Sequence, residues 1–159
     1  MKVLFVCLGN ICRSPSAACV FRDRAAQQGV LVTAEGAGTG AWHVGQPPDA
    51  RAMGEAAVRG YNLSAERAQQ VTVADFARYD LILAMDRANL KALQAIRPSD
   101  AEAELRLFLD FAPDLPLRDV PDPYYEGDFQ GVLALIEQGV DGLIDAIRTG
   151  AVPGSTGRT

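Results

Sequence analysis

Histidine is nearly absent from this chain, and cysteine is absent from most of it. Among 159 residues His43 is the only histidine, and the three cysteines, Cys7, Cys12 and Cys19, all lie near the N-terminus. A secreted disulfide framework spreads an even number of cysteines along the chain. A zinc site needs closely spaced cysteine or histidine ligands. Neither pattern is present, so we expect no disulfide framework and no bound metal.

The chain also has no long hydrophobic run and no excess of positive charge. No stretch approaches the roughly 20 apolar residues of a membrane span, and the apolar start at residues 1–7 is too short for a signal peptide. The net charge of −5 disfavours the basic face that nucleic acids or acidic membranes require. We therefore expect a cytoplasmic protein that binds neither nucleic acid nor membrane.

Short apolar segments alternate with amphipathic ones along the chain. Apolar runs predict strands at residues 2–6, 30–34, 81–84 and 105–109. Helical spacing predicts helices at 15–28, 49–59, 87–96 and 129–147, with loops at 36–48 and 111–127. This alternation is typical of α/β proteins with a parallel sheet. We predict a single domain at residues 1–148 and a flexible tail at 149–159.

The junction between the first strand and the first helix has the composition of a phosphate-binding loop. It reads Cys7-Leu8-Gly9-Asn10-Ile11-Cys12-Arg13-Ser14-Pro15 and follows the carboxyl end of a strand, where parallel sheets bind ligands. Backbone N–H groups at a helix N-terminus attract an anion. Gly9 and Asn10 tolerate the positive φ of a tight anion-binding turn, and Pro15 suits the first helical position. We infer that the residues from Leu8 to Ser14 surround a phosphate.

Side chains of this loop suit nucleophilic chemistry. Arg13 offers a planar fork that grips two phosphate oxygens. Cys7 lies in the same positive field, which favours the nucleophilic thiolate, and the Ser14 hydroxyl can donate to its sulfur. His43 cannot be assumed to act as a base for Cys7, so the loop itself must favour the thiolate. An inert buried cysteine at an ordinary strand-to-helix turn is the alternative reading.

The segment from Val3 to Pro15 closely resembles the signature of the low-molecular-weight protein tyrosine phosphatases. Later segments resemble other motifs of that family in the same order: Ala37-Gly38-Thr39 with Trp42, then Asp75-Phe76, Tyr79-Asp80-Leu81-Ile82-Leu83-Ala84-Met85-Asp86 and Asn89, then Asp122-Pro123-Tyr124-Tyr125. The resemblance implies a four-stranded parallel sheet flanked by helices, in a phosphotyrosine phosphatase I-like, Rossmann-like fold. It covers most of the chain.

The same resemblance implies hydrolysis of protein phosphotyrosine and small aryl phosphates, with no metal and no other cofactor. It makes Cys7 the nucleophile, Arg13 the phosphate clamp and Asp122 the general acid, while Asn10 and Ser14 hold the loop in shape. Such an enzyme passes through a thiophosphate intermediate. As partners we expect a phosphotyrosine protein or an aryl phosphate, with phosphate or sulfate able to occupy the loop. We expect a monomer or weak dimer.

The residues around Asp122 support an acid role but allow another reading. Asp122 lies between two prolines that stiffen the backbone, in a long predicted loop of the kind that is usually functional. Asp-Pro also starts ordinary turns. Trp42, Tyr124 and Tyr125 are expected to wall a pocket for an aryl phosphate. Core burial of Trp42 and Tyr124, and simple surface exposure of Tyr125, are the alternatives.

Two positions depart from the family pattern. Many members have a serine ahead of the Ala-Gly motif and a histidine before the third strand, and both join the hydrogen bonds of Asn10 and Ser14. Gly36 and Glu66 stand at these places, and Gln69 stands where an arginine is common. An inward Glu66 carboxylate would disfavour a nearby thiolate, whereas a solvated one would leave the loop unaffected.

Other functions remain open from the sequence. A thiol-coupled arsenate reductase uses a similar loop but needs further thiols, and no cysteine follows Cys19. A phosphotyrosine-binding module would capture its ligand without turnover. Cys12 either forms a reversible disulfide that shields Cys7 from over-oxidation or simply packs in the core.

Overall fold

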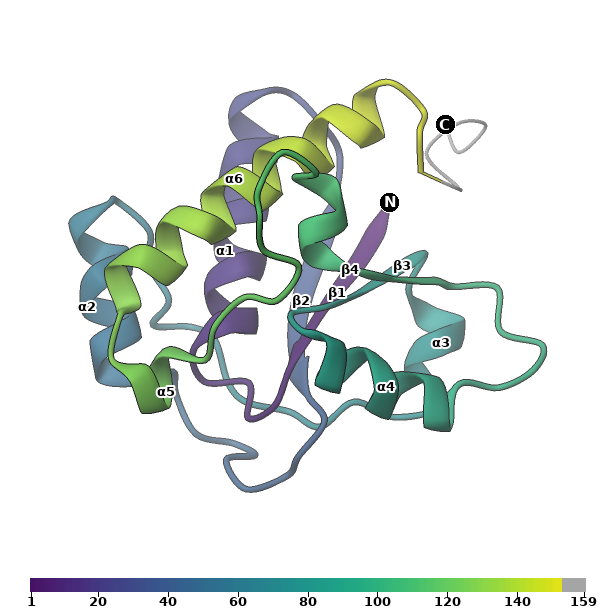
Figure 1. Ribbon diagram of the computed structural model, residues 1–159, viewed down its shortest axis with the longest axis horizontal. Coiled ribbons are helices and arrows are strands. Elements are labelled where there is room, and N and C mark those ends of the chain that lie inside the picture. The colour runs from purple at the N-terminus through teal and green to yellow at the C-terminus, as the bar shows by residue number, and fades with distance from the viewer. Residues whose placement is uncertain (153–159) are drawn as a thin grey trace.

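The computed structural model describes residues 1–152 as a parallel sheet between helices (Figure 1). The strands are β1 (Lys2–Cys7), β2 (Thr33–Gly38), β3 (Leu81–Ala84) and β4 (Glu104–Leu107), in the order β2-β1-β3-β4. The helices are α1 (Arg13–Gln27), α2 (Ala50–Val58), α3 (Asp75–Arg78), α4 (Arg87–Ile96), α5 (Pro123–Glu126) and α6 (Phe129–Arg148), with a 3-10 helix at Phe108–Phe111. The predicted α/β class and the parallel four-stranded sheet are confirmed.

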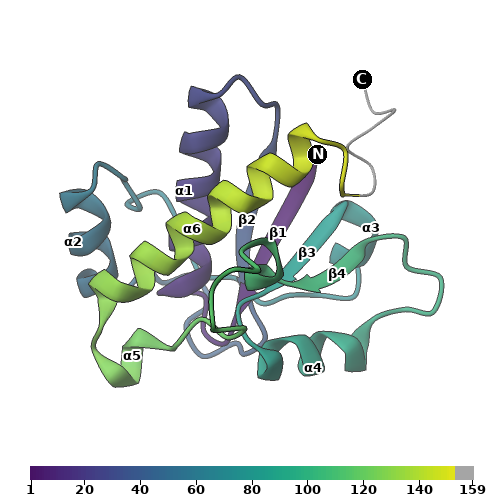
Figure 2. The same cartoon turned by 45° about the horizontal axis from the view of Figure 1, so that its top comes forward.

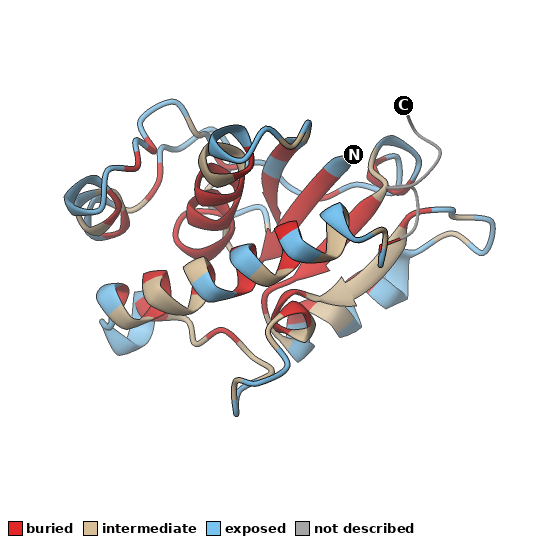
Figure 3. Cartoon of the chain, turned by 90° about the horizontal axis from the view of Figure 1, so that it is seen from above, coloured by how far each residue is buried: buried red, intermediate tan, exposed pale blue. Residues whose placement is uncertain are grey.

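The central strands β1 and β3 are buried on both faces of the sheet, because nearly all their side chains are apolar. Val3, Phe5 and Leu83 belong to the core that also contains residues of α1 and α6. Leu4 and Ile82 point to the opposite face, where Leu93 of α4 is packed. Figure 2 shows α1 and α6 on one side of the sheet and α3 and α4 on the other, and Figure 3 shows the buried strands between them. Continuous apolar strands are typical of such doubly covered parallel sheets.

The strand order creates a crevice beside the first strand. After β1 the chain crosses to β2 on one edge, and after β2 it crosses back to β3 on the other side of β1. Ligands of open α/β sheets bind outside the carboxyl ends of strands at such a reversal. Cys7 is the last residue of β1, and Asp86 comes two residues after β3. The fold therefore brings these side chains to one edge.

Two elements near the N-terminus differ from their predicted positions. The second strand lies at Thr33–Gly38 instead of 30–34, and Gly36 and Gly38 pair with Phe5 and Cys7 in it. Glycine is disfavoured in strands, so the sequence pattern did not predict a strand across these two residues. Helix α1 begins at Arg13, two residues before Pro15. A proline in the first helical turn removes no intrahelical hydrogen bond, because the first four N–H groups have no intrahelical acceptor.

The C-terminal half agrees in part with the predicted elements. Strand β3 and helix α4 have the predicted bounds, while α3 was not predicted. The predicted loop at 111–127 contains the short helix α5. Ordered contacts continue past residue 148, since Val152 is buried in the core. The remainder of the predicted tail, 153–159, lies outside the described residues.

Within residues 1–152, none of the helices combines the length and the apolar character that a membrane crossing requires.

Candidate active site

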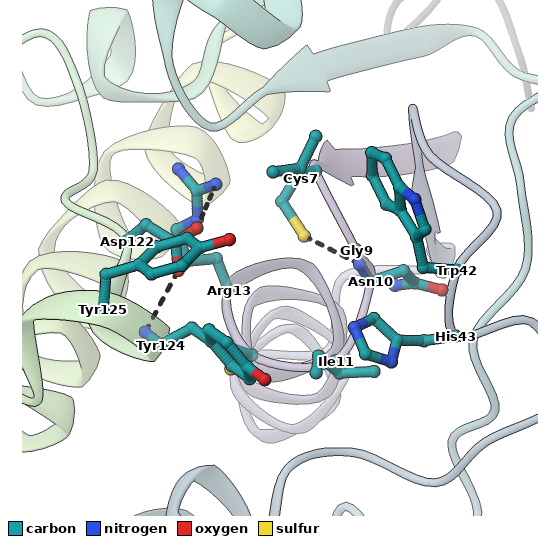
Figure 4. A pocket seen from close by; sticks show the side chains of 12 residues that line it. Cys7, Gly9, Asn10, Ile11, Arg13, Trp42, His43, Asp122, Tyr124 and Tyr125 are labelled. Atoms are coloured by element: carbon teal, nitrogen blue, oxygen red, sulfur yellow. Dashed lines mark hydrogen bonds and ion pairs between the residues drawn. The ribbon is translucent and has the colours of Figure 1, made fainter.

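The carboxyl end of β1 opens onto a cavity of about 280 Å³ (Figure 4). Its walls consist of Cys7, Leu8, Gly9, Asn10, Ile11, Cys12, Arg13, Trp42, His43, Asp122, Tyr124 and Tyr125. Every predicted site residue except Ser14 is among them, and Ser14 is fully buried next to Cys7. Figure 4 shows Cys7 between a side formed by Asp122 and the two tyrosines and a side formed by Trp42 and His43.

The loop after β1 surrounds the Cys7 sulfur with hydrogen-bond donors. Asn10 has a φ of 57°, the left-handed conformation that asparagine tolerates, and its backbone N–H donates to Cys7 Sγ at 3.2 Å. No side chain caps the N-terminus of α1, whose first residue is Arg13. Its first-turn N–H groups are therefore available to an anion at this end of the helix dipole.

Asn10 and Ser14 form a chain of hydrogen bonds that ends at the sulfur. Asn10 Nδ2 donates to Ser14 Oγ at 2.6 Å, and Ser14 Oγ lies 3.0 Å from Cys7 Sγ. Because Ser14 Oγ accepts from Asn10, its own proton can be donated to the sulfur. A hydroxyl that donates to sulfur stabilises negative charge developing there, as when the sulfur departs as a leaving group.

Gln69 supports this chain in place of the family's serine and histidine. Its backbone N–H donates to Asn10 Oδ1 at 3.0 Å, and its Nε2 donates to the Gly36 carbonyl at 2.9 Å. Glu66 lies outside the helices and accepts a hydrogen bond from Arg22 at 3.0 Å. The Glu66 carboxylate is thus paired with a cation, and the loop network is held without it.

Gly36 leaves room for the Asn10 side chain. A Cβ at residue 36 would lie 2.6 Å from Asn10 Nδ2 and 3.2 Å from the Ser14 carbonyl. We expect Gly36→Ala to displace the Asn10 amide from Ser14 and to lower kcat about tenfold, the effect of losing about one hydrogen bond. Gly54→Ala is the control, because a Cβ there meets open space. Steady-state kinetics that leave both variants equal to the parent would contradict the role of this network.

Arg13 is buried and held by acceptors from two distant segments. Its Nη1 donates to Asp86 Oδ2 at 2.6 Å and to the Val120 carbonyl at 3.0 Å, and its Nη2 lies 3.5 Å from Asp122 Oδ2. Burial alone would lower the pKa of Arg13, but the charges of Cys7, Asp86 and Asp122 offset this and raise it, so the guanidinium stays charged. Asp86 also caps the N-terminus of α4, where its Oδ1 accepts from the Asn89 backbone N–H at 2.7 Å. Its role in orienting Arg13 was missed.

Asp122 both caps α5 and faces the cavity. Its Oδ1 accepts from the Tyr124 backbone N–H at 3.1 Å, while Oδ2 is on the side of Arg13. Pro123 takes the first helical position, where it costs no hydrogen bond. The turn-chemistry reading of Asp-Pro was therefore right about the backbone, and it leaves one carboxylate oxygen for chemistry.

The mouth of the cavity is aromatic. Trp42, Tyr124 and Tyr125 are exposed, whereas Cys7 is 3% exposed, so the sulfur is recessed behind the rings. The Tyr124 ring lies 5.1 Å from Tyr125 and 6.4 Å from His43. His43 was not predicted to line the site, although its position next to Trp42 pointed there. Gly9 makes room for its imidazole, since a Cβ would lie 3.0 Å from His43 Cδ2.

Cys12 shares the cavity but not the environment of Cys7. Burial, followed by the charges of Asp49, Cys7 and Asp122, raises the pKa of the Cys12 thiol to about 12. Cys12 therefore stays a neutral, unreactive thiol at neutral pH. The unfolded chain ionises this thiol near pH 9 and the folded chain only near pH 12, so raising the pH from 9 toward 12 lowers the stability of the fold. The Cys7–Cys12 disulfide stays a prediction.

We expect iodoacetamide at neutral pH to alkylate Cys7 well before Cys12, and inorganic phosphate to slow the reaction. Peptide mass spectrometry of the folded protein measures both sites. Equal modification of the two cysteines would contradict the assignment of a special environment to Cys7.

Together, the fold and the cavity define a class: an α/β protein with a cysteine and an arginine in an anion-binding loop, facing a carboxylate. Comparisons with known proteins narrow this class. The family model described as "Low molecular weight phosphotyrosine protein phosphatase" matches residues 2–151. The chain belongs to this family.

Several known proteins are similar to this chain over nearly their whole length. The Bacillus subtilis low molecular weight protein-tyrosine-phosphatase YfkJ is 40% identical over 150 residues, covering 93% of this chain and 96% of the relative. Its crystal structure superposes with a TM-score of 0.90, at 39% identity, over 94% of this chain and 96% of that one. A Streptomyces coelicolor low molecular weight protein-tyrosine-phosphatase is 42% identical, covering 92% and 93%. The structure of Vibrio vulnificus Wzb in complex with benzylphosphonate has a TM-score of 0.79 at 31% identity, covering 91% and 97%.

Proposed function

We propose that this protein hydrolyses phosphotyrosine in proteins, and small aryl phosphates, through a thiophosphate on Cys7. The observation that carries the proposal is the Cys7 sulfur, recessed in the cavity, accepting from Asn10 N–H at 3.2 Å and lying 3.0 Å from Ser14 Oγ. Arg13 and Asp122 line the same cavity. Membership of the phosphatase family supports the reaction class.

In the first step the Cys7 thiolate attacks phosphorus in line with the bond to the leaving oxygen. The S–P bond forms as the P–O bond breaks. Loop N–H groups and Arg13 stabilise the charge on the three equatorial oxygens. Asp122, as the carboxylic acid, gives its proton to the leaving phenolate. The contact between Arg13 Nη2 and Asp122 is long at 3.5 Å, so the guanidinium can exchange it for phosphate oxygens.

In the second step water attacks the phosphorus of the thiophosphate. Asp122, now the carboxylate, takes a proton from this water, and the S–P bond breaks. Inorganic phosphate leaves and the Cys7 thiolate is restored, with the Ser14 hydroxyl donating to the departing sulfur. Protons balance over the two steps, and no cofactor enters either one.

The recessed sulfur and the aromatic mouth favour a long aryl phosphate over a short alkyl one. A phenyl ring spans the mouth and contacts Trp42 and Tyr124, whereas a phosphoserine would have to bring its peptide backbone past them. The benzylphosphonate bound by Vibrio vulnificus Wzb is a ligand of this chemistry. Free phosphate or sulfate would occupy the loop, and a monomer or weak dimer would suffice because every proposed residue lies on one chain.

The test is phosphate release from a phosphotyrosine peptide, beside the same peptide carrying phosphoserine. We expect rapid release from the first and little from the second. Absence of release from either, or equal rates, would overturn the proposal. Because a free thiolate survives best in a reducing compartment, the proposed location is the cytoplasm.

A further inference from the structure

Arg51, in the first turn of α2, connects the phosphate loop to the segment that carries Asp122. Asp49 anchors the Arg51 guanidinium: Nε and Nη2 lie 3.0 and 2.9 Å from the two Asp49 oxygens. Asp49 in turn donates its backbone N–H to the Ile11 carbonyl at 2.8 Å. The hydrogen bond from Arg51 lowers the pKa of Asp49, so the pair stays ionised. A bidentate fork of this kind fixes the plane of the guanidinium.

The same guanidinium lies against two aromatic rings. Its guanidinium carbon is 4.7 Å from the Phe129 centroid and 5.5 Å from the Tyr124 centroid, both within cation–π range. Phe129 is buried at the start of α6, so it provides a fixed surface. Tyr124 is 42% exposed and belongs to the four-residue helix α5. Arg51 is thus a contact that joins this exposed ring to fixed parts of the molecule.

From these contacts we propose that Arg51 is a positioning residue that holds the Tyr124 ring as a preformed wall of the aryl pocket. The proposal rests on the proposed phosphatase function and names the residue that sets its selectivity for aryl groups. Ordering a mobile aromatic side chain on binding costs free energy, and a wall already in place avoids that cost. Arg51 does not line the cavity, so it acts through Tyr124.

Calorimetric binding of benzylphosphonate and of inorganic phosphate tests the proposal without needing turnover. We expect Arg51→Gln to weaken the binding of benzylphosphonate about fivefold and the binding of phosphate less than twofold. Only benzylphosphonate has a ring that contacts the aromatic wall. In Tyr124→Ala, adding Arg51→Gln should cause no further loss for benzylphosphonate, since the two residues act as one unit. Arg51→Lys should lose less than Arg51→Gln, because a cation remains but the planar fork does not.

Matched variants separate positioning from general damage. Arg78→Gln removes an exposed arginine that pairs with Asp75 away from the cavity, and it should bind both ligands normally. Asp49→Asn keeps a capping side chain for α2 but removes the ion pair, so it should resemble Arg51→Gln. The proposal fails if Arg51→Gln weakens both ligands equally, weakens neither, or adds to the loss in Tyr124→Ala. Failure of the proposed function would instead show as absence of turnover in a parent protein that still binds benzylphosphonate.

Discussion

Cys7→Ser is expected to abolish phosphatase turnover while phosphate binding persists. A serine hydroxyl at this position stays protonated at neutral pH, so the nucleophile is lost, and we expect kcat to fall by at least about 10⁴-fold. The loop N–H groups and Arg13 remain, so inorganic phosphate should still bind. Hydrolysis of p-nitrophenyl phosphate and calorimetry with phosphate measure the two properties.

Cys19→Ser is the matched control for this change. Cys19 is also a buried cysteine of the N-terminal region, but its sulfur donates to the Asn62 carbonyl and lies outside the cavity. A serine can make the same hydrogen bond, so activity should be kept. Retained turnover in Cys7→Ser, or equal loss in both variants, would reject Cys7 as the nucleophile.

Asp122→Asn is expected to slow the hydrolysis of phosphate esters with poor leaving groups far more than that of esters with good ones. The amide cannot give a proton to the leaving oxygen. General acid catalysis of this kind contributes a rate factor of about 10²–10⁴. Phosphotyrosine and phenyl phosphate should lose close to that factor. p-Nitrophenyl phosphate should lose much less from its first step, because its leaving group needs no proton. Rates of thiophosphate formation across a series of aryl phosphates provide the measurement.

The backbone around Asp122 should survive this substitution. Asparagine caps helices about as well as aspartate, so α5 should keep its N-cap. Asp128→Asn is the control, because Asp128 caps α6 by accepting from Gly131 N–H at 2.8 Å and does not line the cavity. An equal loss for all leaving groups in Asp122→Asn would remove the acid role.

The sequence predicted those parts of the molecule that depend on local pattern. Strand β3 is an unbroken apolar run and helix α4 has helical apolar spacing, and the bounds of both were predicted correctly. The Cys7 loop was recognisable because all its parts lie within nine consecutive residues. The predicted position of β2 was displaced because Gly36 and Gly38 are not typical strand residues. Helix α5 was missed because an Asp-Pro pair is typical of a turn.

Contacts between distant segments were beyond the sequence. Arg13 and Asp86 are 73 positions apart, and neither residue indicates the other without the sheet that aligns β1 and β3. The same holds for Arg51, which reaches Tyr124 and Phe129 only after α2, α5 and α6 have packed. The ion pair between Glu66 and Arg22, and the hydrogen bond by which Gln69 supports Asn10, likewise depend on tertiary structure.

A phosphoryl group held covalently on Cys7 defines the proposed reaction, and acid quenching within the first turnover would trap it. With p-nitrophenyl phosphate the leaving group departs quickly, so the thiophosphate should accumulate before water attacks it. We expect a burst of p-nitrophenol close to one per protein molecule and, by mass spectrometry, a single phosphoryl group on the peptide that contains Cys7. Turnover without a burst and without that adduct, or a phosphoryl group on another residue, would rule out Cys7 as the nucleophile.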